Sequence, residues 1–352
     1  MGAVFGKNIQ FTIFGESHGP AIGGVISSVP HGVKLDFPYI DMFLKRRNHK
    51  ALYTTKRQEA DNYEILSGVK DGVTTGAPLA FIIRNGDTRG KDYSELENLV
   101  RPGHSDYPAF VKYEGFNDVS GGGHFSGRLT APLTFAGSVA RQILRDKGIE
   151  IYSYVVSVGN TKCPIETDDV KEMQKADFPV AEDSYKEKFL QEMENAAKDG
   201  DSVGGVIRCV IKNVPAGVGE PFFHSVESEI AKMMFSIPAV KGVEFGKGFE
   251  ITSMRGSEAN DCYQVRDGEI KTVTNNNGGV TGGITNGSDV VFQVAIKPTP
   301  SIFKPQQTVN VDTKTNEILQ LKGRHDSCIV PRATVAVESG AALVVLDLLG
   351  GK

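Results

Sequence analysis

Several short polar segments of the chain combine residue types that transfer protons. FGESHG at 14–19 places Ser17 and His18 between glycines, and RPGHSDY at 101–107 places His104 after a Pro-Gly turn. Because histidine has a reference pKa of about 6.5, both imidazoles are suited to giving or taking a proton near neutrality. The spacing fits neither metal ligands nor a Ser-His-Asp triad, so the sequence predicts acid–base chemistry around a ligand and no metal site.

Another segment supplies cations for an anionic ligand. LKRRNHKALYTTKRQEAD at 44–61 follows Asp41 and contains no acid before Glu59. A solvated helix face, which is the alternative interpretation, would interleave acids with its bases. Guanidinium groups bind phosphates and carboxylates bidentately, so the imbalance favours a bound anion. The basic residues concerned are Lys45, Arg46, Arg47, Lys50, Lys56 and Arg57.

Glycine-rich loops accompany these residues. GGGHFSGR at 121–128 opens with consecutive glycines, although glycine is costly to order. Such a loop ahead of a helix offers backbone N–H groups that suit phosphate, while a flexible turn is the alternative. It is neither a Walker loop nor a GxGxxG motif. The remaining polar segments are TNNNGGVTGGITNG (274–287), KPTPS (297–301) and GRHDSC (323–328), the last with Arg324, His325 and Asp326.

Regular elements between these loops would position them. Apolar, β-branched runs bounded by turn residues predict strands, and apolar residues at helical spacing predict helices. In the helix expected from Thr130, Pro132 suits the first turn and Gly148 suits the position beyond the end. The expected strands are 23–29, 79–84, 151–158, 204–212 and 290–297, and further helices are expected near 184–199, 225–236 and 333–349.

Two similarities between the halves of the chain indicate an internal duplication. GGVISSVPHGV at 23–33 resembles GGVIRCVIKNVPAGV at 204–218, and GVTTGAPLAFIIR at 72–84 resembles GITNGSDVVFQVAIK at 283–297. The order is the same in both halves, while the offsets differ, so insertions separate the copies. We therefore predict a pseudo-two-fold duplicated core in a single domain spanning 1–352.

Composition indicates a globular protein that acts on small molecules. Its 352 residues are 39% hydrophobic, which allows a large core. The apolar runs are shorter than the roughly 20 residues of a membrane span, and no secretory leader is recognisable, so we expect a cytoplasmic protein without membrane contact. A net charge of −4 argues against a nucleic-acid partner. Cys163, Cys209, Cys262 and Cys328 are scattered singly and are expected to be reduced.

Taken together, these segments resemble the chorismate synthase family. The matching motifs are FGESHG, YTTKRQEAD, RPGHSDY, the glycine triplet with its Ser and Arg, GGVTGGITNG, KPTPS and GRHD, in the family's order and spacing from about residue 5 to 349. The resemblance implies an α+β fold, a β-α-β sandwich of antiparallel sheets with helices between them, and a homotetramer. It also implies a carbon–oxygen lyase acting on phosphates in the shikimate pathway of aromatic amino acid biosynthesis.

The reaction that the resemblance implies is the anti 1,4-elimination of phosphate from 5-enolpyruvylshikimate 3-phosphate, which gives chorismate. The family requires reduced FMN although there is no net redox change. The flavin donates electron density transiently and accepts the proton at N5, while the protein supplies placement and electrostatics. Some family members reduce their flavin with NADPH, and others depend on an external source.

The resemblance also assigns roles to the catalytic candidates of this sequence. His18 corresponds to the histidine near the departing phosphate, and His104 to the one that protonates the reduced flavin. Asp326 corresponds to the acid that, with Ser17 and Ser126, assists proton removal. The implied arginines around substrate and flavin are Arg46, Arg101, Arg128 and Arg324, and the implied flavin contacts are His124, Phe125, Ser126, Gly278, Lys297, Pro298, Thr299, Pro300, Ser301 and Arg324.

Two departures from the family pattern bear on the cofactor. Many members have Arg-Ser-Ser where this chain has His124-Phe125-Ser126, so one cation and one hydroxyl of the flavin site are changed. Many also carry an arginine just before the YTT, where this chain has Leu52. The second change favours an external source of reduced flavin over intrinsic reduction by NADPH.

Two other classes of protein remain as alternatives. A flavin- or nucleotide-dependent oxidoreductase would also need cations and glycine loops, but it would consume NAD(P)H in proportion to product. A phosphosugar-binding module would need the arginines without His104 or Asp326. Replacing either of these residues would leave the affinity of such a module unchanged.

Overall fold

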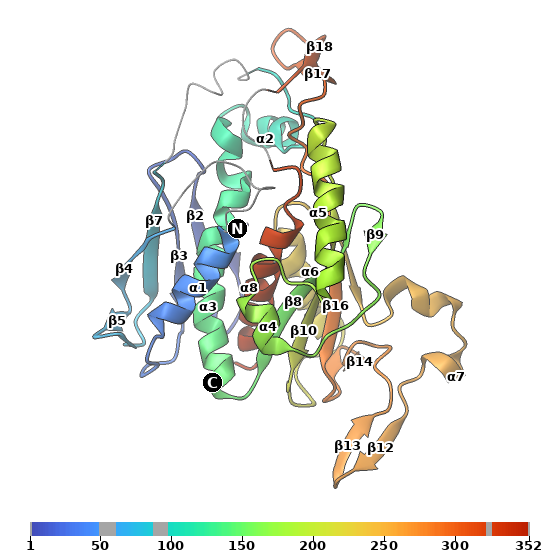
Figure 1. Cartoon of the computed structure of the whole chain (residues 1–352). Helices are drawn as coiled ribbons and strands as arrows, with labels where there is room; N and C mark the ends of the chain where they lie inside the picture. The colour runs from blue at the N-terminus through green and yellow to red at the C-terminus, as the bar shows by residue number, and fades with distance from the viewer. Residues whose placement is uncertain (1, 49–60, 87–97, 322–325, 351–352) are drawn as a thin grey trace.

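Two antiparallel sheets enclose a set of helices in the computed structural model, which describes residues 2–48, 61–86, 98–321 and 326–350 (Figure 1). The first sheet has the order β1-β2-β3-β7-β4 and the second the order β11-β16-β10-β8-β9. The strands of the first are Val4–Phe5, Gln10–Gly15, Ala21–Ser27, Leu79–Arg84 and Tyr63–Ser67 in that order, and those of the second are Val240–Phe245, Val290–Ile296, Gly205–Lys212, Glu150–Val158 and Thr161–Lys162.

Two long helices fill the space between the sheets. The helix α3 (Thr130–Asp146) packs on β2, β3 and β7, while α8 (Val330–Leu348) packs on β8 and β10. The two helices also pack on each other, and they approach closely at Gly137, where a Cβ would lie 2.3 Å from Cβ of Ser339. The prediction of a mixed fold with antiparallel sheets is therefore confirmed, as are the strands and helices expected from periodicity.

Shorter elements surround this centre. The helix α1 (Phe37–Arg47) packs against α3 and α8, and α6 (Val226–Ser236) packs against α8 and β11. The other helices are α2 (Asp106–Tyr113), α4 (Val170–Lys175), α5 (Asp183–Lys198), α7 (Gly256–Ala259), η2 (Ser120–Phe125), η3 (Gly127–Leu129), η4 (Phe222–His224) and η5 (Gly248–Ser253). Small two-stranded sheets join β5 (Val69–Lys70) to β6 (Val73–Thr74), β12 (Tyr263–Arg266) to β13 (Glu269–Thr272), β14 (Val280–Thr281) to β15 (Ile284–Thr285) and β17 (Gln306–Asn310) to β18 (Thr315–Leu319).

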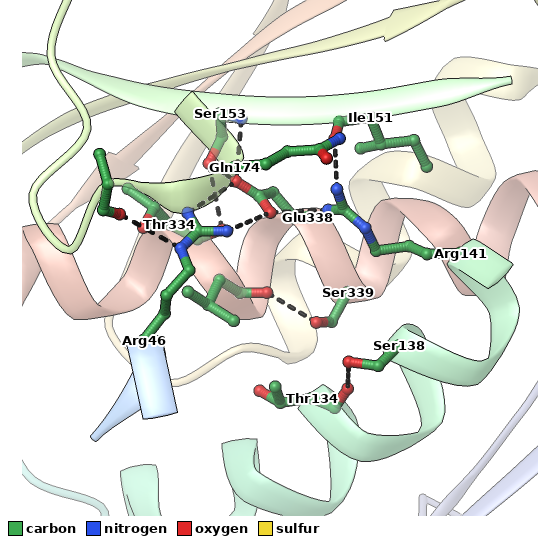
Figure 2. A network of polar contacts seen from close by, with 12 residues as sticks. Arg46, Thr134, Ser138, Arg141, Ile151, Ser153, Gln174, Thr334, Glu338 and Ser339 are labelled. Atoms are coloured by element: carbon green, nitrogen blue, oxygen red, sulfur yellow. Dashed lines mark hydrogen bonds and ion pairs between the residues drawn. The ribbon is translucent and has the colours of Figure 1, made fainter. Parts of the chain in front are cut away.

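A buried ionic network ties the helices to the second sheet (Figure 2). Glu338 of α8 is fully buried and accepts from both Nη atoms of Arg46 at 3.1 and 3.2 Å. The same carboxylate accepts from Arg141 Nη1 at 2.6 Å and from the Ser153 amide at 3.0 Å. Nε of Arg46 donates to the carbonyl oxygen of Ala176 at 3.2 Å. The carboxylate of Glu338 thus links α1, α3, α8 and β8 in the buried centre of the molecule.

The two halves share a threonine-centred turn with the same hydrogen bonds. In the first half, Thr74 Oγ1 accepts from Val33 N at 2.9 Å and donates to Pro30 O at 2.6 Å. In the second, Oγ1 of Thr285 accepts from Val218 N at 2.9 Å and donates to the carbonyl of Pro215 at 2.7 Å. These contacts lie within the segments that resemble each other in sequence. Four strands of each large sheet also follow the same order. In β2-β3-β7-β4 and in β8-β10-β16-β11, the strand that comes third along the chain lies at the edge, beside the fourth.

Replacing either threonine by valine is expected to destabilise the fold by a similar amount. Both side chains are buried, and each substitution removes two hydrogen bonds, so we expect a loss of about 1–3 kcal/mol in each case. Urea unfolding of Thr74→Val and Thr285→Val measures the loss in the free energy of unfolding. The control is Thr75→Val, a substitution of the exposed residue next to Thr74. A clear loss in only one of the two variants would show that the turns are not equivalent.

An acid near the end of α8 holds the amino-terminal segment. The Asp347 carboxylate accepts from the backbone amides of Lys7, Asn8 and Ile9 at 3.0, 2.6 and 2.8 Å. These amides precede β2, so the side chain fixes the first sheet to the last helix. Among the described residues, no helix combines the length and apolar character that crossing a membrane requires.

The four cysteines are free thiols in this structure, as expected. Cys163, Cys209 and Cys328 are buried, and only Cys262 is exposed. Burial raises the pKa of Cys328 to about 12, so this thiol is neutral at physiological pH. The part of the chain that the structure describes contains no group of His, Cys, Asp and Glu side chains suited to a metal ion.

Candidate active site

The first catalytic candidates, Ser17 and His18, lie in a tight turn that follows β2. Gly19 N donates to Glu16 O at 3.2 Å and closes the turn. Ser17 is fully buried, and its amide donates to Gly123 O at 3.1 Å. The FGESHG turn is therefore pinned to the glycine triplet, which lies more than a hundred residues later in the sequence.

The glycine triplet makes room for the histidine of this turn. Gly121 adopts φ 59°, and a Cβ there would lie 2.1 Å from Cε1 of His18. Gly123 adopts φ 51°, and its Cβ would lie 2.2 Å from the carbonyl oxygen of Asp118. Only glycine tolerates both the positive φ and the close contacts. The sequence indicated an open loop for a ligand, whereas two of the glycines are required by contacts within the protein.

Gly121→Ala is expected to lower turnover about tenfold to hundredfold because the added methyl must displace the His18 ring. A displacement of about 1 Å at a catalytic group has costs of this order. The matched control is Gly127→Ala in the same loop, where a Cβ would meet no atom within 4 Å. Steady-state turnover of both purified variants checks this. Equal activities would show that the ring does not need its observed position.

Arg128 is joined to the histidine turn through an asparagine. Its Nε donates to Asn85 Oδ1 at 3.1 Å. Nδ2 of the same asparagine donates to the carbonyls of Gly19 and Glu16 at 2.8 and 3.0 Å. Ser126 Oγ accepts from the amide of Arg128 at 3.3 Å and begins η3. The Ser-Gly-Arg segment and the Ser-His turn therefore form one hydrogen-bonded unit.

A buried carboxylate lies between two arginines of the site. Asp61 accepts from Arg47 Nε at 3.0 Å and forms a second ion pair with Arg128 through its other oxygen. Burial by itself would raise the pKa of Asp61, but the two guanidinium groups bring it below its ordinary value, so the group is ionised. Two cations on one carboxylate leave a net positive charge, which suits an anionic ligand.

The residues that depart from the family pattern lie at the edge of this unit. His124 is exposed, and its Nδ1 makes a 2.9 Å hydrogen bond with Gly15 O. Phe125 is 42% exposed, with its ring centroid 6.4 Å from that of Tyr113. The phenyl ring is thus partly open to an aromatic ligand.

The RPGH segment packs against the KPTPS segment. His104 Nε2 lies 2.8 Å from Ser301 Oγ. Lys297 Nζ donates to the carbonyl of Gly103 at 2.5 Å, and a Cβ on that glycine would lie 2.8 Å from Cβ of Pro300. Burial and the nearby Lys241 lower the pKa of Lys297.

Arg101 is held by an acid of its own motif. Its Nε and Nη2 donate to the two carboxylate oxygens of Asp106 at 2.7 and 2.8 Å. Burial tends to raise the pKa of Asp106, but the hydrogen bonds and charge of Arg101 lower it overall. The pair orients the guanidinium and occupies one of its edges.

Backbone contacts bring these parts to Asp326. Ser202 Oγ donates to Thr299 O at 2.6 Å, and the next residue, Val203, donates its amide to Ser327 O at 2.9 Å. Asp326 precedes that serine and is 8% exposed. The KPTPS segment, with His104 against it, is therefore linked through Ser202 and Val203 to the residue that follows the buried acid.

Two predicted site residues occupy different places. Arg46 lies in the central network with Glu338, where all three of its guanidinium nitrogens bond to protein atoms. The carbonyl of Gly278 accepts from Val291 N at 3.1 Å, so this glycine lies beside the first residues of β16. Lys297 follows the other end of the strand. At about 3.3 Å per residue, β16 separates Lys297 from Gly278 by about 20 Å. Arg324 and Leu52 are outside the described residues.

Comparisons with known proteins identify the family of the chain. The family model described as chorismate synthase matches residues 9–349. The chain belongs to the chorismate synthase family. The family and the lyase class expected from the motifs are therefore confirmed. Chorismate synthase eliminates phosphate from 5-enolpyruvylshikimate 3-phosphate in the shikimate pathway.

Individual members of the family are similar over nearly their whole length. The chain is 47% identical over 345 residues to the chorismate synthase of Thermococcus gammatolerans, covering 98% of this chain and 96% of the relative. It is 45% identical over 346 residues to that of Dehalococcoides mccartyi, with 97% and 95% covered. A crystal structure of chorismate synthase superposes with a TM-score of 0.76 at 29% identity, covering 98% of this chain and 92% of that one.

Four site residues were missed when the sequence was read as a set of motifs: Arg47, Asp61, Asn85 and Arg332. A signal existed for two of them, because Arg47 belongs to the basic run and Asp61 is the last residue of the YTTKRQEAD motif. Asn85 follows the strand β7 and Arg332 lies in the first turn of α8, and neither carries a local signature. Their place becomes visible only when the two halves of the molecule are packed together.

Proposed function

We propose that this chain catalyses the anti 1,4-elimination of phosphate from 5-enolpyruvylshikimate 3-phosphate with Ser17, His18, His104, Ser126 and Asp326. The observation that carries the proposal is the single hydrogen-bonded unit in which Asn85 joins Arg128 to the histidine turn. This unit brings a cation, an imidazole and the buried hydroxyl of Ser17 to one place, whereas a phosphosugar-binding module would need only the cation.

The anionic groups of the substrate would be met by arginines. Arg47 and Arg128 share one carboxylate, Asp61, and so retain a net positive charge in a buried setting. Arg101 would contribute the edge of its guanidinium that Asp106 does not occupy. A protonated His18 beside these cations would neutralise the charge that develops on the departing phosphate. Arg324 is proposed on the family motif alone.

The residues present fit a flavin at the KPTPS segment. Thr299 Oγ1 is buried without a hydrogen-bond partner among the described residues, which is costly unless a ligand completes it. Lys297 and Ser301 flank it, and Phe125 offers a partly exposed ring. When bound, reduced FMN supplies electron density to the substrate ring and a nitrogen that takes up the ring proton.

The acid–base residues would act on either side of that position. His104 would hold or release a proton at its imidazole ring, whose Nε2 is oriented by the hydrogen bond with Ser301 Oγ. Asp326, with the hydroxyls of Ser17 and Ser126, assists removal of the ring proton. The flavin contacts proposed are His124, Phe125, Ser126, Lys297, Pro298, Thr299, Pro300, Ser301 and Arg324, while Gly278 and Arg46 are left out because backbone packing and the central network account for them.

The duplicated core and the assembly are further parts of the proposal. We infer a duplication because the Thr74 and Thr285 turns repeat the same two hydrogen bonds, and the two large sheets share the same strand order. On the family resemblance we propose a homotetramer in the cytoplasm. Association of subunits is supported by Phe222, Phe223 and Phe249, which are 84%, 89% and 83% exposed and would be covered by another subunit. A monomer by analytical ultracentrifugation would contradict the assembly.

The function is tested by an anaerobic assay with purified protein, 5-enolpyruvylshikimate 3-phosphate and chemically reduced FMN. Chorismate absorbance and released phosphate should rise together in equal amounts. A parallel assay contains NADPH and oxidised FMN, and because Leu52 replaces the usual arginine we expect chorismate only in the first. Consumption of NADPH in proportion to product would indicate an oxidoreductase, and a folded protein that makes no chorismate in either assay would contradict the proposal.

A further inference from the structure

Arg332 occupies a place between two parts of the site that no motif connects. It is in the first turn of α8, six residues after Asp326, and its Nη1 donates to Asp326 Oδ2 at 2.8 Å. Its Nε donates to the backbone carbonyl of Arg47 at 3.1 Å. The arginine therefore contacts the acid from one half of the chain and the last residue of α1 from the other.

The second contact links the acid to the cationic part of the site. Arg47 ends α1, and its side chain runs to Asp61, which also binds Arg128. A shift of the Arg47 backbone would move this whole group. The carbonyl at the end of a helix also carries partial negative charge, so a guanidinium is well suited to hold it.

We propose that Arg332 is a positioning residue that holds the Asp326 carboxylate in the site and locks it to the end of α1. This inference rests on the proposed function, in which Asp326 assists proton removal. A planar guanidinium holds two acceptors in fixed directions, whereas a lysine presents one compact charge. The side chain of Arg332 is 25% exposed and that of Asp326 9%, so the pair is shielded from water and its geometry is constrained.

An arginine of similar exposure elsewhere provides the control. Arg208 Nη1 lies 2.8 Å from Glu166 Oε1, and the Arg208 side chain is 18% exposed against 25% for Arg332, although its acid is 65% exposed. The pair lies at the outer face of the second sheet, among the residues lining a cavity of about 630 Å³ that contains none of the proposed catalytic residues. Arg208→Ala thus removes a similar arginine without touching the site.

The test is a double-mutant cycle on kcat with Arg332→Ala, Asp326→Ala and the double variant. We expect Arg332→Ala to lower kcat about tenfold to hundredfold, because a displaced carboxylate loses alignment, and KM for the substrate to change less. In the Asp326→Ala background the second substitution should have almost no further effect on kcat. Arg332→Lys should recover part of the activity, and Arg208→Ala should match the wild type.

Each alternative outcome is distinct. If the effects of Arg332→Ala and Asp326→Ala multiply independently, Arg332 does not act through the acid and the inference is wrong, while the proposed function stands. If Asp326→Ala turns over like the wild type, the role proposed for the acid fails and the inference fails with it. Circular dichroism establishes folding, and if Arg332→Ala is unfolded, the cycle is run with Arg332→Lys under the same criteria.

Discussion

Asp326→Ala is expected to lower turnover by about 10²–10⁴-fold, the range typical of a lost acid–base group. The carboxylate is 8% exposed and belongs to the last residue of the GRHD motif, one residue before Ser327, whose carbonyl is linked through Val203 and Ser202 to the KPTPS segment. Turnover in the anaerobic assay measures the loss, and thermal unfolding establishes that the variant folds. The control is Glu166→Ala, which removes an exposed acid paired with Arg208 of β10, outside the proposed site.

His104→Ala tests the same chemistry from the other side. A fall of the same order is expected, because the ring nitrogen fixed by Ser301 would no longer hold a proton there. Ser301→Ala should have a smaller effect, since it removes one hydrogen bond and leaves the imidazole. Near-wild-type turnover in both His104→Ala and Asp326→Ala would rule out the acid–base assignment.

Glu338→Ala is expected to destabilise the protein by about 3–5 kcal/mol, more than any other single substitution considered. Breaking a buried ion pair leaves uncompensated charge in the interior, and here Arg46 and Arg141 would both lose their acid. Urea unfolding monitored by circular dichroism measures the change. Glu64→Ala is the control, because its pair with Arg84 is exposed and screened by solvent, so its loss should cost far less stability. A loss at Glu338 no larger than the control would show that the network is not structural.

The elements of the fold could be read from the sequence because their periodicity is strong. The helix expected from Thr130 ends at Asp146, two residues before the glycine that indicated its end. The strand expected at 204–212 is Gly205–Lys212. Both segments are amphipathic or fully buried and are bounded by turn residues. Such patterns indicate which residues are buried when the segment packs on another layer. The family motifs likewise located the turn at His18.

The roles of the two adjacent arginines could not be read in the same way. Arg46 and Arg47 lie side by side in one basic run, yet Arg46 turns to Glu338, 292 residues away, and Arg47 turns to Asp61. Neighbouring residues on a helix point about 100° apart, and which direction faces the core depends on how α1 packs. The acids that receive them are set by the tertiary fold, so the sequence alone could not show that Arg46 faces the central network and Arg47 faces Asp61.

The glycines illustrate a second limit. A run of glycine shows that something approaches the backbone, but it does not show whether that is a ligand or the protein itself. At Gly121 the neighbour is the His18 ring, and at Gly278 it is the backbone of Gly246, 2.4 Å from where a Cβ would be. Such distances become available only once segments far apart in sequence are placed together.

The contact of Asp347 with the amides of Lys7, Asn8 and Ile9 can form only late in the synthesis of the chain. These groups are separated by about 340 residues. At a translation rate of about 5–20 residues per second, the amides wait roughly 17–70 s before their acceptor leaves the ribosome. Until then the segment before β2 lacks its anchor on α8. Attachment of the first sheet to the last helix therefore takes place only after nearly the whole chain has been synthesised.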